Sequence, residues 1–221
     1  MPNMRRRGPE PAPGMPIVEH QPGLADQMLR ELAPLLAEDG IDVDNLDATD
    51  LDTLQAAMNR AVERLNMARF TPVGRAREYA ITTLRLVIEA IADDDTHLAA
   101  AILDSVPPES ADDTSATVAG CIGVALGLLD GWLAGHNQRT PAGLAQQIRL
   151  PAGHWTGERA ATDILTLASK GRSFRSLDTL ITRQGGQHVL YGAALALAAA
   201  AAAWSRQTGT PITELVHAEV R

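Results

Sequence analysis

The sequence is poor in the residues that build cross-links, aromatic cores and most catalytic sites. One of its 221 residues is cysteine, Cys121, so no disulfide can form within the chain, which suits a reducing compartment. Aromatic residues amount to 3%, so Leu, Ile, Val, Met and Ala must build the core. Small side chains, above all the abundant alanine, leave gaps between sheets but suit helices that approach closely. We therefore expect a cytoplasmic, helical protein with Cys121 as an inert thiol in its core.

Positive charge is scarce in the first half of the chain. The formal net charge is −8; residues 1–110 carry 10 basic and 19 acidic side chains, whereas residues 111–221 carry nine basic and eight acidic ones. A protein that binds nucleic-acid phosphates in general needs positive charge clustered on its surface. This distribution argues against general nucleic-acid binding.

No catalytic or cofactor-binding signature is present in the sequence. There is no phosphate-binding loop, no G-x-S-x-G motif and no paired set of cysteine or histidine ligands. The acidic run at residues 38–52 offers no register with the oxygen ligands, glycine and final glutamate of an EF-hand loop. We therefore expect no catalytic residues, no cofactor and no metal site.

The first 23 residues contain six prolines and no helical period, which predicts a flexible tail that is disordered or loosely docked. The basic triplet Arg5–Arg7 precedes no apolar stretch, so this segment does not resemble a secretory signal. Residues 24–221 are expected to form one domain. A candidate sub-boundary lies at 107–113, where two prolines separate an acidic helical half from a half rich in glycine and alanine.

From Leu24 onward the apolar residues recur with a helical period, and no segment alternates as a strand does. This spacing predicts an all-α protein, a compact bundle of about eight to ten helices. Three Thr-Pro pairs, at 71–72, 140–141 and 210–211, are typical of helix starts. One apolar stripe, which follows two good N-cap residues, consists of Leu51, Leu54, Met58, Val62 and Leu65.

Two stretches predict a closely packed pair of helices. Glycine recurs every four residues within 116–135, so these glycines share one helix face. Each interior glycine costs a helix about 0.5–1 kcal/mol relative to alanine, which is tolerated where another backbone approaches the bare face. Alanine occupies nine of the eleven positions 193–203, and a helix this slim is a suitable neighbour. We expect this packing within the chain or between two subunits, with these residues in contact: Gly123, Gly127, Gly131, Ala199 and Ala203.

The same two stretches must be weighed as membrane spans. The apolar run at 189–204 has 16 residues, fewer than the roughly 20 that span a bilayer. The stretch 116–135 is long enough, and glycine every four residues is a packing pattern of transmembrane helices, but Asp130 lies inside it. We expect both stretches to be core helices of a protein without a membrane span.

Two weaker patterns define the alternative functions. Acid-x-x-His pairs, as in di-iron bundles, occur at 94–97 and 214–217, close to the number that chance predicts from this composition. The acids available to complete such a site are Glu63, Glu78 and Asp130. Residues 140–155 have the apolar spacing of a helix-turn-helix motif, although Pro151 and Gly153 would interrupt its second helix. The basic residues of this region are Arg149, Arg159, Lys170, Arg172, Arg175 and Arg183.

By elimination, the sequence favours a non-catalytic interaction or regulatory protein that acts through protein–protein contacts, as a homo-oligomer. Its expected partner is another protein or a second copy of itself, and neither nucleic acid nor a membrane is expected. The alternatives are a helix-turn-helix DNA-binding regulator and a metal-dependent helical-bundle enzyme.

Overall fold

The computed structural model describes residues 24–48, 51–109, 116–136, 144–153, 155–170 and 172–220. The predicted tail, residues 1–23, lies outside these ranges. Every regular element within them is a helix: ten α-helices and one short 3-10 helix. The predicted all-α bundle of eight to ten helices is therefore confirmed.

The helices differ widely in length, from four residues to 23. In chain order they are α1 (Leu24–Glu38), η1 (Val43–Ala48), α2 (Leu51–Phe70), α3 (Gly74–Ala92), α4 (Thr96–Asp104), α5 (Val118–His136), α6 (Leu144–Gln147), α7 (Glu158–Ala168), α8 (Leu177–Gln184), α9 (Gly186–Thr208) and α10 (Ile212–Glu219). Two of the Thr-Pro pairs do precede helices, since α3 begins two residues after Pro72 and α10 begins directly after Pro211. The third pair, at 140–141, lies outside the described ranges.

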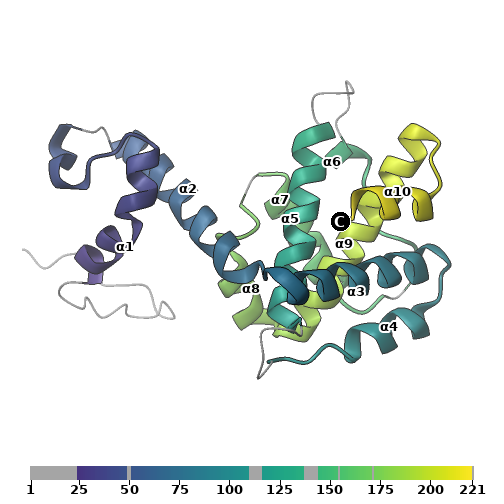
Figure 1. Cartoon of the computed structure of the whole chain (residues 1–221). Coiled ribbons are helices and arrows are strands. Elements are labelled where there is room, and N and C mark those ends of the chain that lie inside the picture. The colour runs from purple at the N-terminus through teal and green to yellow at the C-terminus, as the bar shows by residue number, and fades with distance from the viewer. Residues whose placement is uncertain are drawn as a thin grey trace, which may run out of the picture.

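The alanine-rich helix α9 lies within the body of the molecule and has neighbours on several sides (Figure 1). It packs most extensively against α7, α5 and α3, and it also contacts α4, α6, α8 and α10. Fourteen of its 23 residues are buried. Because alanine adds a single carbon to the backbone, several helices can approach this one closely. The alanine stretch is a core helix, as its sequence predicts.

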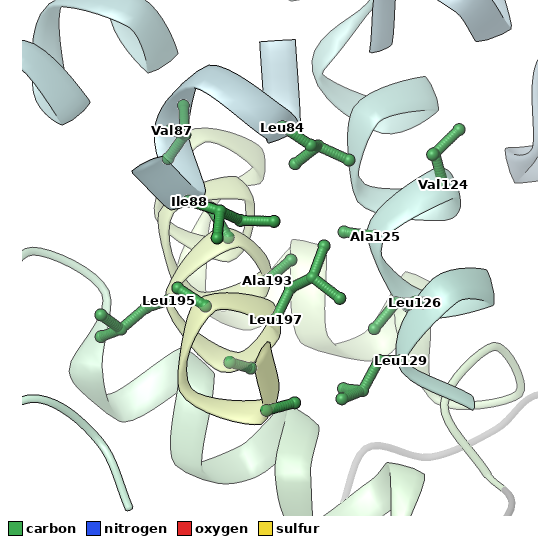
Figure 2. Close-up of a cluster of buried hydrophobic side chains, with 14 of the residues drawn as sticks. Leu84, Val87, Ile88, Val124, Ala125, Leu126, Leu129, Ala193, Leu195 and Leu197 are labelled. Atoms are coloured by element: carbon green, nitrogen blue, oxygen red, sulfur yellow. The ribbon is translucent and has the colours of Figure 1, made fainter. Parts of the chain in front are cut away.

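The main hydrophobic core forms where α3, α5 and α9 meet (Figure 2). Leu84 and Ile88 come from α3, Ala125 and Leu129 come from α5, and Leu197 of α9 points between them; each is at most 1% exposed. The helical spacing that predicts an apolar face on α3 thus identifies the face that is buried.

The inner face of α5 also carries the lone cysteine and an aromatic contact. Cys121 is fully buried, and this burial raises the pKa of its thiol to about 12, so the thiol stays protonated at neutral pH. About three helical turns further along, Trp132 meets Trp204 of α9 edge to face, with ring centroids 5.5 Å apart and an interplanar angle of 68°. Both contacts tie α5 to the central core.

Helix α9 has 23 residues, whereas the apolar run at 189–204, which predicts no membrane span because of its length, has 16. With 23 residues and a mean hydropathy of 1.4, it has the length and composition of a membrane-spanning helix, so the argument from a 16-residue run is wrong. Its burial is the better argument, because 78% of its apolar part is enclosed by this fold. No other helix in the described ranges has that length and composition, and the apolar part of α5, Val118–Ala134, is shorter.

The N-terminal helices form an arm that projects from the body (Figure 1). We define the arm as α1, η1 and residues 51–62 of α2. Arg64 closes this hairpin, because its guanidinium donates to the carbonyl oxygen of Leu35 at 2.6 Å and lies 3.1 Å from Asp39 Oδ2. The guanidinium also holds the pKa of Asp39 below its usual range. The arm has a small hydrophobic core of its own: Leu32, Leu36, Ile41, Ala57 and Ala61.

The hydrophobic core divides along α2 and not at 107–113. Helices α3 and α4, which precede that segment, share one cluster of buried residues with α5 and α9, which follow it. Within α2, Ala57 and Ala61 belong to the core of the arm, whereas Phe70 belongs to the core of the body. A single continuous helix therefore connects two separate cores.

Candidate functional site

The glycine stripe of α5 faces a different neighbour from the one predicted. Gly123 lies against the end of α2, where a β-carbon would come within 2.5 Å of the carbonyl carbon of Phe70. A β-carbon at Gly127 or Gly131 would meet no described atom within 4 Å. Helix α5 does pack against α9, but through its other face, which carries Ala125. The predicted packing of Gly127 and Gly131 against the alanine helix of the same chain is therefore wrong.

An open groove lies over this stripe, between the end of α2 and α5. Its volume is about 480 Å³, and most of its lining is apolar. Gly127 leaves part of the groove bare, and Met67 contributes a side chain from α2. The hydroxyl oxygen of Thr71 is buried there and has no hydrogen-bond partner among the residues described. Beyond Gly123, the glycine stripe thus forms an open surface.

A second close approach between helices involves a glycine that the sequence pattern does not indicate. Gly192 of α9 lies directly against Ala160 of α7, and a β-carbon at Gly192 would be 2.7 Å from the backbone nitrogen of Ala161. Ala199 and Ala203, which the sequence predicts as helix-packing residues, are both buried in α9. Ala203 belongs to the central core, and Ala199 lines a cavity between α9, α3 and the segment after α6.

The apolar stripe of α2 is only partly covered by the rest of the chain. Leu51 is 81% exposed and Leu65 is 42% exposed. The small residues Ala57 and Ala61, and not this stripe, form the fully buried side of the helix within the arm. The middle residues of the stripe are half-buried against the core of the arm: Leu54, Met58 and Val62.

Charge is scarce along the first half of this stripe. Between Asp52 and Arg60, helix α2 contains no charged residue. Its exposed positions there are occupied by Thr53, Gln55 and Ala56. Apolar surface with few charges is typical of the centre of protein–protein interfaces, whereas an ordinary solvated helix face is rich in charge. The arm therefore presents a candidate interface.

Polar contacts fix the joint between α2 and the body. The carboxylate of Glu63 accepts hydrogen bonds from the backbone N–H groups of Phe174 at 2.8 Å and Arg175 at 2.6 Å. Asn66 donates to the carbonyl oxygen of Phe174 at 3.1 Å. Because these bonds satisfy backbone groups just before α8, they hold that segment against α2 and set the direction in which the arm projects.

Asp130 of α5 contacts the same segment from the body. It accepts a hydrogen bond from Ser173 Oγ at 2.8 Å. Burial raises the pKa of Asp130 to about 6, the hydrogen bond from Ser173 opposes this rise, and the negative charge of Glu63 adds to it. The carboxyl group of Asp130 therefore changes its charge close to neutral pH.

The acids and histidines proposed as metal ligands lie mostly apart. Asp94 is exposed at the turn between α3 and α4, His97 is exposed at the start of α4, and His217 on α10 lies 3.4 Å from a carboxylate oxygen of Glu89. Within the part of the chain that the structure describes, no three such side chains come together as metal ligands do. Of the three acids considered, Glu63 and Asp130 come near each other.

The helix pair of a helix-turn-helix motif is not formed at the predicted place. Helix α6 spans four residues, Leu144–Gln147, and residues 148–153 after it are not helical. The proline and the glycine of this segment, Pro151 and Gly153, fit its irregular path. The second helix expected there, which would enter the major groove of DNA, is therefore absent from residues 148–153.

The basic residues of this region lie in different places. Arg183 pairs with Asp163 at 2.8 Å, and Arg149 lies at the cavity that Ala199 lines. Arg159 is exposed on α7. The remaining three border a hollow of about 380 Å³ beside α2, together with Arg60, Glu63 and Arg64. Those side chains are Lys170, Arg172 and Arg175.

Comparisons with protein-family models, with curated proteins and with solved structures found no match for this chain.

Proposed function

We propose that the protein is a non-catalytic interaction protein that self-associates through the apolar stripe of α2. One observation supports this most directly: the arm projects from the body with a small core of its own, while an apolar stripe on the same helix stays partly uncovered. A hairpin of two helices can bury apolar surface on one side only. Two hairpins packed together form a four-helix bundle, in which both stripes are covered.

The chemistry of the stripe favours a second copy of this chain as the partner. A two-fold interface places the same patch of both subunits in contact, so the patch must be compatible with itself. The stripe is apolar, and α2 carries no charge between Asp52 and Arg60, so two copies bring no like charges together there despite the net charge of −8. Its spacing of three, four, four and three residues, from Leu51 to Leu65, is that of helices that pack side by side.

Sedimentation velocity tests this proposal. We expect the full chain to sediment as a dimer and the double variant Leu51→Ser/Leu65→Ser to sediment as a monomer with unchanged helicity. Both side chains are exposed within the chain, so their truncation removes intersubunit contacts without opening a core.

A matched control comes from the body. Leu86 on α3 and Leu98 on α4 are 48% and 49% exposed, and the double variant Leu86→Ser/Leu98→Ser removes similar side chains away from the arm. We expect this control to remain a dimer. A parent chain that is monomeric at every soluble concentration, or an arm variant that remains dimeric, would contradict the proposal.

A further inference from the structure

A second site lies near the C-terminal end of α9, away from the contact between Gly192 and Ala160 of α7. A cavity of about 580 Å³, open to solvent on one side, is bordered by α9, the end of α3, the segment after α6 and the start of α10. This volume lies within the range of roughly 300–1,000 Å³ that is typical of small-molecule sites. Its walls are mainly aliphatic, with Ile88 and Ile91 from α3, Leu150 from the segment after α6 and Ile212 from α10.

The alanines of α9 make room for this cavity. Ala198 and Ala202 are four residues apart, and Ala199 lies beside them, so the three share one face of the helix. A longer aliphatic side chain at these positions would extend into the cavity. In the centre of the body small residues let neighbouring helices approach α9, whereas here they leave open space.

Two arginines border this apolar space. Arg206 follows Ala202 by one helical turn, so it lies on the same face of α9. Arg149 Nη1 donates to the carbonyl oxygens of Gln146 at 2.7 Å and Ile148 at 2.8 Å, and Arg206 Nη2 donates to that of Gln147 at 3.4 Å. Three successive carbonyl groups thus hold both guanidinium groups to the same short segment.

Neither guanidinium is neutralised by a carboxylate within the described part of the chain. Arg149 and Arg206 form no ion pair there, and the neighbouring residues 137–143 contain no Asp or Glu. The planar guanidinium group binds carboxylates through two parallel hydrogen bonds.

We propose that this cavity binds a small amphipathic carboxylate. Its aliphatic chain would lie over Ala198 and Ala202, and its carboxylate would contact Arg149 and Arg206. The combination of an apolar cavity with a few charged groups at one side fixes both the class of ligand and its orientation. This site is separate from the α2 stripe, so it does not depend on self-association.

Isothermal titration calorimetry of the full chain with decanoate tests the site. We expect one decanoate per chain, no binding of acetate, which lacks the aliphatic chain, and clearly weaker binding of 1-decanol, which lacks the charge. Arg206→Gln and Arg149→Gln should each weaken decanoate binding by about tenfold or more, because each removes a charge-assisted hydrogen bond. Arg159→Gln, an exposed position on α7 that does not line the cavity, should leave the affinity unchanged.

A cavity-filling variant tests the position of the ligand without removing a charge. Ala202 is half-buried, so Ala202→Leu can extend into the cavity without displacing a helix. We expect this variant to lose decanoate binding and to keep the melting temperature of the parent chain. The proposal is overturned if decanoate does not bind, if the Arg149 and Arg206 variants bind it as the parent does, if 1-decanol binds equally well, or if Ala202→Leu retains its affinity.

Discussion

Gly192 of α9 lies directly against Ala160 of α7, so no side chain fits between the two helices at this point. Gly157, which precedes α7, adds to the contact, because a β-carbon there would lie 2.6 Å from the backbone nitrogen of Gly192. The φ angle of Gly157 is 87°, a conformation that favours glycine. The two helices with the most extensive contact in the body therefore meet backbone to backbone.

This relationship predicts opposite effects for alanine at two glycines. Alanine is favoured over glycine inside a helix by about 0.5–1 kcal/mol. At Gly192 the added methyl group forces α7 away from α9, and overpacking of this kind costs about 1–3 kcal/mol or more, so Gly192→Ala should be less stable. At Gly127 the methyl group enters open space, so Gly127→Ala should be more stable by up to about 1 kcal/mol. Urea denaturation followed by circular dichroism measures both changes.

A stabilised Gly192→Ala would show that the contact at Gly192 does not limit the packing of α7, and a destabilised Gly127→Ala would show that Gly127 does not face open space. The Gly127 variant also separates two ways of forming a dimer. We expect it to remain dimeric, because the α2 stripe carries the proposed contact. If Gly127→Ala is stable but monomeric, the subunits meet at the groove beside α5 instead.

The fold class could be predicted because helical spacing is a local property. Leu84, Val87 and Ile88 are all fully buried, and their positions follow directly from the i, i+3, i+4 pattern of α3. The partner of each face could not be predicted in the same way. A glycine stripe shows that a close approach is sterically allowed, but Gly123 meets Phe70, which the sequence does not indicate. For the contact of Gly192 with α7, the sequence offers only small residues on the partner helix: Ala160 and Ala161, shortly after Gly157.

The candidate sites could not be predicted from the sequence for related reasons. The stripe from Leu51 to Leu65 has the same period whether it faces its own core or another chain, and only its exposure distinguishes the two. The cavity on α9 combines Arg149 with Arg206, which are 57 residues apart. No spacing rule links two such positions until the fold brings them together. Ala199 was selected as a packing residue, and it lines this cavity.

The raised pKa of Asp130 predicts how stability depends on pH. Its pKa is about 6 in the folded chain, above the ordinary value of 3.8, so the folded state binds the proton more tightly. Its contribution to stability is therefore present at low pH and is lost as the pH rises through this window. Asp130→Asn removes the charge and keeps an acceptor for Ser173. Its stability relative to the parent chain should increase by roughly 1 kcal/mol between pH 5 and pH 7.5.

Urea denaturation of both chains at the two pH values measures this difference. Glu214→Gln is a suitable control, because it removes a carboxylate that is exposed on α10. For the control we expect the same difference from the parent chain at both pH values. A pH-independent difference for Asp130→Asn would mean that Asp130 titrates alike in the folded and unfolded chains.

The separation of two cores along α2 predicts two levels of stability in one chain. The core of the arm is small, so α1 can open without unfolding the body, whereas opening α9 exposes the central core. In a dilute solution of the Leu51→Ser/Leu65→Ser variant, backbone amides of α1 should exchange with deuterium at least about tenfold faster than those of α9.

In the parent chain, pairing of the arms should slow exchange in α1 as the protein concentration rises, because binding stabilises the closed arm. Exchange in α9 should not change. Equal protection of α1 and α9 in the dilute variant would show that arm and body unfold together, since the contacts of Glu63 and Asn66 would then couple the two cores.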